Sequence, residues 1–167
     1  LMHFIGKDNI VFHCIIFPIL LKEHGDFILP HQVPANEFMN LEGDKISTSR
    51  NWAVWVSEFL ENNPDGSDPM RYVLTSIMPE QKDSEFTWND YRDRINNELA
   101  DVLGNFVNRV LVLTRKYYEG SVPAIPEGHK LTEVDTSLMN ELESASEKIG
   151  DLILRFRFRE AQLEAMN

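Results

Sequence analysis

Cysteine is almost absent from this sequence. Cys14 is the only cysteine among 167 residues. A disulfide needs two cysteines and a Cys-rich zinc site needs several, so both are excluded within this chain. We therefore expect no metal site here, and the low cysteine content is typical of a reducing compartment, which predicts a cytoplasmic protein.

Long apolar runs are also missing. The most apolar stretch is residues 10–21, IVFHCIIFPILL, which His13 and Pro18 interrupt. A membrane-spanning helix needs about 20 apolar residues, so a run this short suits a buried helix instead. The chain opens on a strand-like stretch, Leu1–Ile5, without the basic segment of a signal peptide. We expect an internal piece of a longer protein that does not enter a membrane.

Positive charge is scarce. The chain has 16 Lys and Arg against 27 Asp and Glu, a net charge of −11. Such a chain has no overall attraction to nucleic acid, so any RNA contact has to come from local basic positions. Its composition, 43% hydrophobic and 26% charged, is that of a soluble globular protein.

The pattern of what is present changes along the chain. Up to about residue 50, apolar runs alternate with turns, which predicts α/β structure with Asp8 as the N-cap of the first helix and Gly25 at its end. Beyond that point apolar spacing indicates helices only, so we expect α/β followed by all-α. The predicted helices are residues 9–22, 51–61, 69–78 and 88–118, with one or two further helices over residues 132–166.

The first motif of chemical interest is FIGKDNIVFH, at residues 4–13. Gly6 at a strand end lets a ligand approach the backbone, and the following helix start is where α/β folds bind ligands. Asp8 could accept hydrogen bonds from ribose hydroxyls. The alternative is that Asp8 only caps the helix and His13 lies in the core. Three residues at helical spacing would share one face and offer a wall to a small substrate: Asn9, His13 and Phe17.

The second motif is the polar loop KISTSR, residues 45–50, which follows a glycine turn. Lys45 supplies a point charge, and hydroxyls such as that of Ser47 supply donors, so the loop could hold a polyphosphate. The alternative is a loop that merely caps the helix predicted next, with Ser49 or Asn51 as the cap.

The third motif lies on the long helix predicted for residues 88–118. Its apolar stripe indicates a core-facing side, and Asn105 and Arg109, four residues apart, fall beside that stripe. An Arg and an Asn can read base edges because their groups are planar and carry several donors. The alternative is a solvated flank of the helix.

Taken in order, these motifs resemble class I aminoacyl-tRNA synthetases, and the methionyl-tRNA synthetase family in particular. HFIGKDNIVFH is similar to the family's strand-to-helix segment, and EFMNLEGDKISTSRNWAVW is similar to its KMSKS loop. DPMRYVLTSIMPE and LGNFVNR resemble the link to the anticodon domain and the first long helix of that domain. The resemblance covers almost the whole chain.

The resemblance implies roles for individual residues. Gly6 and Asp8 would line the ATP ribose, and the strand of Phe38 and Met39 would meet adenine through its backbone. Lys45 would be the catalytic residue that contacts the phosphates. The remaining implied roles are ATP binding by Ser47, methionine binding by Asn9, His13 and Phe17, and recognition of the first base of the CAU anticodon by Asn105 and Arg109.

It also implies a larger reaction and a division into domains. The parent enzyme would use ATP, with Mg, to form methionyl-adenylate from methionine and then charge tRNA(Met). We expect residues 1–50 to be the C-terminal half of a Rossmann-type catalytic domain, residues 51–84 to be stem-contact helices and residues 85–167 to be part of an anticodon-binding helical bundle.

The sequence departs from the family pattern at two points. Thr48 stands where many family members have a second lysine, and the HIGH-type phosphate motif is absent. The KISTS form also resembles the family, so Thr48 does not imply loss of function. Because the HIGH-type half of the nucleotide site is absent, we expect the piece to be inactive alone. We also expect the open edge of the Leu1–Ile5 strand to favour self-association. Two alternatives stay open: a fragment of another class I synthetase, and a non-enzymatic acidic helical interaction module with no strands before residue 45.

Overall fold

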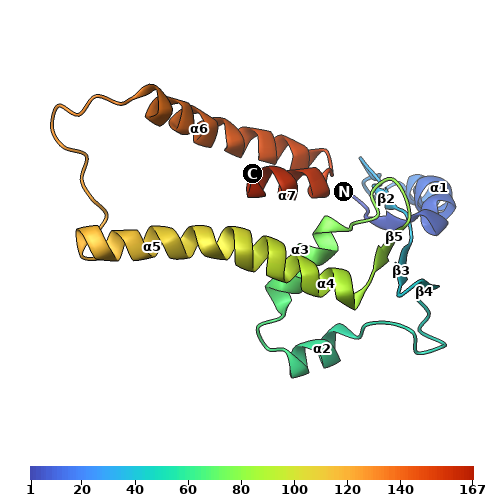
Figure 1. Ribbon diagram of the computed structural model, residues 1–167. Coiled ribbons are helices and arrows are strands. Elements are labelled where there is room, and N and C mark those ends of the chain that lie inside the picture. The colour runs from blue at the N-terminus through green and yellow to red at the C-terminus, as the bar shows by residue number, and fades with distance from the viewer.

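The computed structural model describes all residues, Leu1–Asn167, and is mostly helical with two small sheets (Figure 1). The strands are β1 (Ile5–Gly6), β2 (Ala35–Asn36), β3 (Met39–Leu41), β4 (Asp44–Lys45) and β5 (Ser84–Phe86). The α-helices are α1 (Phe17–His24), α2 (Val56–Asn62), α3 (Ser67–Ser76), α4 (Trp88–Arg94), α5 (Asn105–Tyr118), α6 (Glu133–Leu154) and α7 (Phe158–Met166). Three further helical segments are a 3-10 turn, η1 (Lys7–Asn9), and two π-helical stretches, η2 (Phe12–Ile16) and η3 (Ile95–Gly104).

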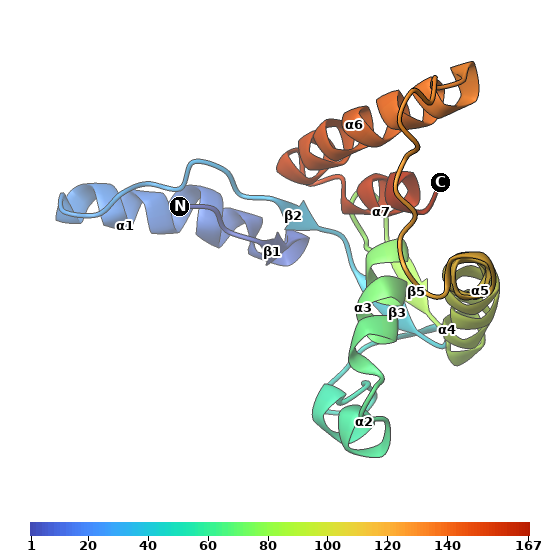
Figure 2. The same cartoon turned by 90° about the vertical axis from the view of Figure 1, so that its left-hand side faces the viewer.

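The first strand and helix form a parallel crossover. β1 pairs with β2 in parallel, and the chain between them runs through η1, η2 and α1, which is the connection that parallel strands require. The strand predicted for Leu1–Ile5 is shorter than expected, because only an isolated bridge between Met2 and Gln32 precedes Ile5–Gly6. In Figure 2 this unit projects to one side of the molecule.

The ends of this first helix are partly as predicted. Gly25 ends it with a φ of +93°, a left-handed conformation that suits glycine. Asp8 as the N-cap is wrong, since Asp8 lies inside the 3-10 turn and Gly6 occupies the cap position without a side-chain bond. The helix also continues two residues beyond the predicted end, to His24.

A three-stranded sheet carries the main core. β3 lies between β4, which is antiparallel to it, and β5, which is parallel to it. In the second pairing Leu41 lies opposite Phe86, which follows it by 45 residues in the sequence. A two-residue turn joins β3 to β4, and both of its residues, Glu42 and Gly43, have positive φ, as hairpin turns of this kind require. The buried core packs α3 against this sheet; its residues are Leu41, Met70, Val73, Ile77 and Phe86.

The helix predicted for residues 51–61 begins later than expected. α2 starts at Val56, and Trp52 instead forms a β-bridge with Ser47 and donates its indole N–H to the carbonyl of Leu41 at 3.1 Å. These tertiary bonds override the local helical spacing. Neither Ser49 nor Asn51 caps α2, whose N-cap position is Trp55.

The long helix predicted for residues 88–118 is confirmed, with Thr87 accepting the Asp90 N–H at its start. Its middle is π-helical, η3, which the apolar spacing did not predict. The expected core stripe is mostly exposed: Ile95 and Leu99 are half-buried, and the next apolar residues of the stripe are exposed. Those exposed residues are Val102, Leu103, Phe106, Val110 and Leu113.

The chain then returns to its starting region. α6 begins with a capping box at Thr132 and lies apart from the long helix, which Figure 2 shows end-on while α6 extends across the view (Figures 1 and 2). α7 brings the chain back onto α3, where the amide of Gln162 donates to the carbonyl of Tyr72 at 3.1 Å and to the Ser76 hydroxyl at 2.8 Å. None of these helices is both long and apolar enough to cross a membrane.

Candidate functional site

Gly6 lies where β1 gives way to the helix. Its position explains the residue type, because a Cβ built on Gly6 would lie 2.7 Å from a carboxylate oxygen of Asp8. Any larger residue would therefore push the Asp8 side chain away from the strand end. Asp8 itself is exposed, so its carboxylate is open to a ligand at this turn.

The predicted helix face forms a small aromatic cluster. The ring centroids of His13 and Phe17 are 6.4 Å apart, and Nδ1 of His13 lies 3.2 Å from the carbonyl oxygen of Asn9. His3 completes the cluster, with its ring centroid 5.5 Å from that of His13 and 5.7 Å from that of Phe17. The structure thus brings His13 and Phe17 together, while the Asn9 side chain has no bond to either.

His3 is the residue that sequence reasoning missed. It lies next to the backbone ladder, where its N–H donates to the carbonyl of Gln32 at 3.1 Å. Its Nδ1 is buried and has no hydrogen-bond partner. The sequence did carry a signal for this. Side chains two residues apart on a strand share a face, so an extended Leu1–Ile5 places His3 and Ile5 on one face and Phe4 on the other.

Lys45 lies on a hairpin rather than in a free loop. β4 ends with Lys45, and the following turn is closed by the Ser47–Trp52 bridge and by Arg50, which donates to the Lys45 carbonyl at 2.9 Å. The hydroxyls of Ser47 and Ser49 are 3.1 Å apart. This segment therefore carries an exposed lysine at the end of β4 and a hydroxyl pair in the turn that follows.

A cluster of charges joins the first sequence motif to the residues before β3 and β5. The ammonium of Lys7 pairs with Glu37 and, at 2.8 Å, with Asp83, and the same Asp83 oxygen accepts the backbone N–H of Phe38 at 3.0 Å. The hydrogen bond from Lys7, followed by that from Phe38, lowers the pKa of Asp83 below its usual 3.8. The bonds to Asp83 and then Glu37 raise the pKa of Lys7 above 10.5.

Phe38 is where the two motifs meet. The Nζ atom of Lys7 lies 4.4 Å from the centroid of the Phe38 ring, and the Nζ atom of Lys45 lies 4.9 Å from it. Met39 follows directly in β3 and pairs with Ser84 of β5. The strand-to-helix turn, the β3 strand and the Lys45 hairpin therefore form one region.

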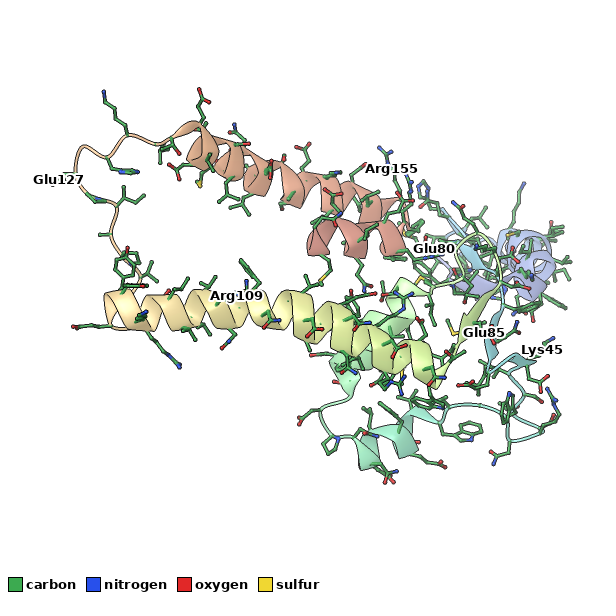
Figure 3. The ribbon with its side chains drawn as sticks, viewed as in Figure 1. Lys45, Glu80, Glu85, Arg109, Glu127 and Arg155 are labelled. Atoms are coloured by element: carbon green, nitrogen blue, oxygen red, sulfur yellow. The ribbon has the colours of Figure 1, made fainter.

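Asn105 and Arg109 lie in a separate place. Figure 3 shows Arg109 on the long helix, away from Lys45. The amide of Asn105 donates to the carbonyl of Asp101 at 2.9 Å, and Arg109 takes part in none of the ion pairs of the structure. Both side chains line a shallow groove of about 310 Å³, whose other residues are Asp101, Val102, Phe106, Val110 and Leu113.

A larger cavity, about 790 Å³, lies between α3, η3 and α7, and no sequence motif pointed to it. On its wall the hydroxyl of Tyr72 donates to Glu98 at 2.6 Å, and Glu98 also accepts from Arg94 at 3.2 Å. Burial, followed by the bond to Glu98, raises the pKa of Tyr72 above 10.0. The structure contains no group of three His, Cys, Asp or Glu side chains that could hold a metal ion.

Comparison with known proteins connects these regions to one family. The family model described as tRNA synthetases class I (M) matches residues 1–111. The methionine–tRNA ligase of Christiangramia forsetii is 60% identical over 100% of this chain, which is 24% of that relative, and the Bacteroides fragilis (strain YCH46) ligase is 59% identical with the same coverage. The chain thus spans about a quarter of the length of these relatives.

Solved structures give the same result. Mycobacterium tuberculosis methionyl-tRNA synthetase in complex with methionyl-adenylate superimposes with a TM-score of 0.85 at 27% identity, over 99% of this chain and 31% of that one. The free form of the same protein gives a TM-score of 0.80 at 27% identity, over 99% and 30% of the respective chains.

Proposed function

Because this chain belongs to the methionine branch of the class I tRNA synthetases, we propose that it is part of a methionine–tRNA ligase. In the whole enzyme the carboxylate of methionine attacks the α-phosphate of ATP, forming methionyl-adenylate and releasing pyrophosphate, and the methionyl group then passes to tRNA(Met) with release of AMP. Such catalysis consists chiefly of holding the reactants in place and stabilising charge on the phosphates.

The observation that carries the proposal is the meeting of two distant motifs around Phe38. The strand-to-helix turn at Gly6 and Asp8 supplies an open backbone and a carboxylate for the ribose. The Lys45 hairpin supplies an ammonium, and the turn that follows supplies the Ser47 hydroxyl, for the phosphates of ATP, which would enter together with Mg. Phe38 lies between the two lysines that border these parts, so one nucleotide could engage both.

The aromatic cluster supplies the methionine side of this site. His3, His13 and Phe17 lie with ring centroids 5.5–6.4 Å apart. Aromatic rings make favourable contacts with a thioether sulfur, so this cluster, with Asn9 at its edge, suits the methionine side chain. His3 is the addition that the structure makes to the residues proposed from the sequence.

We assign the remaining parts to tRNA. Residues 1–50 would be the C-terminal half of the Rossmann-type catalytic domain, residues 51–84 the stem-contact region and residues 85–167 the anticodon-binding part. The groove with Asn105 and Arg109 would receive the first anticodon base. The alternative of a non-enzymatic helical module predicted no strands before residue 45, whereas β1, β2 and β3 lie there.

Amino-acid-dependent pyrophosphate exchange tests the proposal. The full-length protein that carries this segment should exchange pyrophosphate into ATP with methionine and not with leucine, isoleucine or valine. It should also charge a tRNA with the CAU anticodon. Exchange driven by one of the other three amino acids, with none for methionine, would overturn the assignment in favour of another class I synthetase.

A further inference from the structure

Phe38 has two ammonium groups over its ring, and they come from different parts of the chain. Lys7 follows β1 and lies 4.4 Å from the ring centroid, while Lys45 ends β4 and lies 4.9 Å from it. The face of an aromatic ring attracts a cation through its quadrupole within about 6 Å. Both lysines are therefore within range of this attraction.

The ring is anchored independently of Lys45. The backbone N–H of Phe38 donates to Asp83 at 3.0 Å, and the same oxygen holds Lys7 at 2.8 Å. Phe38 is half-buried, and its neighbour Glu37 is the second carboxylate on Lys7. Asp83 itself lies just before β5, which pairs with β3. The ring position is thus set by the sheet and by the Lys7 cluster.

The charge balance of this cluster favours a second cation. Lys7 carries one positive charge and its partners Glu37 and Asp83 carry two negative charges. Lys45 has no carboxylate partner in any ion pair of the structure. The ring face is therefore the contact that holds the Lys45 ammonium, and the net negative cluster beside it offsets repulsion from Lys7.

We propose that Phe38 is a positioning residue for Lys45, whose ammonium its ring keeps beside the nucleotide site. The proposal rests on the function assigned above. A lysine side chain has four rotatable bonds and loses rotamer freedom when it is fixed on a phosphate. A ring that restricts the ammonium beforehand reduces that loss when charge develops at the transition state.

A double-mutant cycle in the full-length protein tests this role. Phe38→Leu keeps an apolar side chain but removes the ring face, and Phe38→Tyr keeps the face. We expect Phe38→Leu to lower the kcat of methionine-dependent pyrophosphate exchange about two- to five-fold, the range typical of an exposed cation–π contact. The KM for methionine should not change, and Phe38→Tyr should retain the unsubstituted rate.

The decisive comparison uses the Lys45→Ala background. There, Phe38→Leu should cause no further loss of kcat, because the Lys45 ammonium is gone and the Lys7 ammonium is still held by Glu37 and Asp83. Phe27→Leu serves as the matched control, since Phe27 is an exposed ring that lies against His24 and has no lysine over it.

Two outcomes would overturn the inference. One is an equal loss from Phe38→Leu in both backgrounds, which would indicate a purely structural role for the ring. The other is a Phe38→Leu enzyme with unchanged kcat. If the unsubstituted protein shows no methionine-dependent exchange, the proposed function itself fails, and this inference fails with it. If exchange is normal but the losses from Phe38→Leu and Lys45→Ala simply add, only the positioning role fails.

Discussion

At the scale of single residues, the surroundings of Lys45 indicate that this lysine affects the catalytic rate more than substrate binding. Its ammonium is exposed and has no ion-pair partner, so it is free to meet a phosphate. A contact that strengthens as phosphate charge develops acts on kcat rather than on substrate binding.

We therefore expect Lys45→Ala in the full-length protein to lower kcat for pyrophosphate exchange, with a loss of transition-state stabilisation of about 2–4 kcal/mol. Methionine affinity should change little. Exchange kinetics measure both quantities. Lys22→Ala, at an exposed lysine near the end of α1, is the matched control. An unchanged rate in Lys45→Ala would place this lysine in a merely solvated hairpin.

The Lys7–Asp83 pair makes a prediction about pH. The pKa of Asp83 is lowered by Lys7, so its stabilising effect is present above pH 3.8 and is lost as pH falls through the lower folded value. The pKa of Lys7 is raised, so its effect is present below pH 10.5 and is lost as pH rises through the higher folded value. Between pH 3.8 and pH 10.5 the contribution of the Lys7–Asp83 pair to the free energy of unfolding should be constant.

Thermal unfolding of the 167-residue chain against pH measures this contribution. The melting temperature of Asp83→Asn should lie below that of the unsubstituted chain by a constant amount at neutral pH, and the difference should shrink below pH 3.8. Asp26→Asn, at an exposed carboxylate, should show no such difference. A difference that is largest in acid would contradict the assignment.

At the scale of elements, the long helix joins the core to the proposed RNA groove. Its first part is half-buried against α3, and its later part carries Asn105 and Arg109 beside exposed apolar residues. An acidic chain cannot depend on general phosphate attraction, so contacts to base edges have to supply specificity.

Arg109→Ala in the full-length protein should therefore cost about 1–3 kcal/mol in tRNA recognition. Pyrophosphate exchange without tRNA should stay unchanged, because the proposed nucleotide site lies elsewhere. The measurement compares charging of tRNA with CAU and with a changed first anticodon base, and Arg115→Ala on the same helix is the control. Equal discrimination by Arg109→Ala and the unsubstituted protein would refute the assignment.

Sequence spacing located most elements but not their details. Gly25 marked the end of the first helix correctly, because a positive φ at a helix end is a local property. Trp52 was misassigned to a helix since its bond to Leu41 is a tertiary contact that no local pattern reveals. The π-helical stretches were missed because the spacing argument assumes the 3.6 residues per turn of an α-helix.

The same distinction between local and tertiary contacts applies to the residues of the candidate site. The residues on one motif, such as His13 and Phe17, could be grouped by helical spacing. Lys7, Phe38 and Asp83 could not, because their contact depends on pairing between strands far apart in sequence. The resemblance to a family implied roles for single residues. The contact of both lysines with one ring depends on the three-dimensional fold and could not be read from the sequence.

At the scale of the whole molecule, much apolar surface lies open. The side chains of Phe12, Ile15 and Leu20 are 54–61% exposed, and those of Phe106 and Leu142 are 65% and 61% exposed. Open apolar patches of this kind favour association.

We expect the 167-residue chain to self-associate. Sedimentation velocity over a range of concentrations should show species heavier than a monomer, increasing with concentration. Leu142→Glu on α6 and Phe106→Glu on α5 should reduce them if those faces take part, while Asp68→Ala on α3 should not. A monomer at all concentrations would contradict the expectation.

The chain alone should not activate methionine. It holds the Lys45 hairpin but no HIGH-type motif, and it spans about a quarter of its curated relatives. Half of a phosphate site leaves the transition state without its other donors. Pyrophosphate exchange by the 167-residue chain should match a heat-killed control, and activity above that control would show that these residues suffice.

The pairing of β3 with β5 also sets an order of events on the ribosome. Leu41 of β3 finds its partner Phe86 only after the whole of α2 and α3 has been made. At about 5–20 residues per second, synthesis of the intervening segment of about 45 residues takes roughly 2–9 s. During that interval β3 has only the β4 hairpin as a neighbour. The edge of β3 that will receive β5 is therefore unpaired during that interval, and the charged strand β4, with Asp44 and Lys45, covers only the opposite edge of β3.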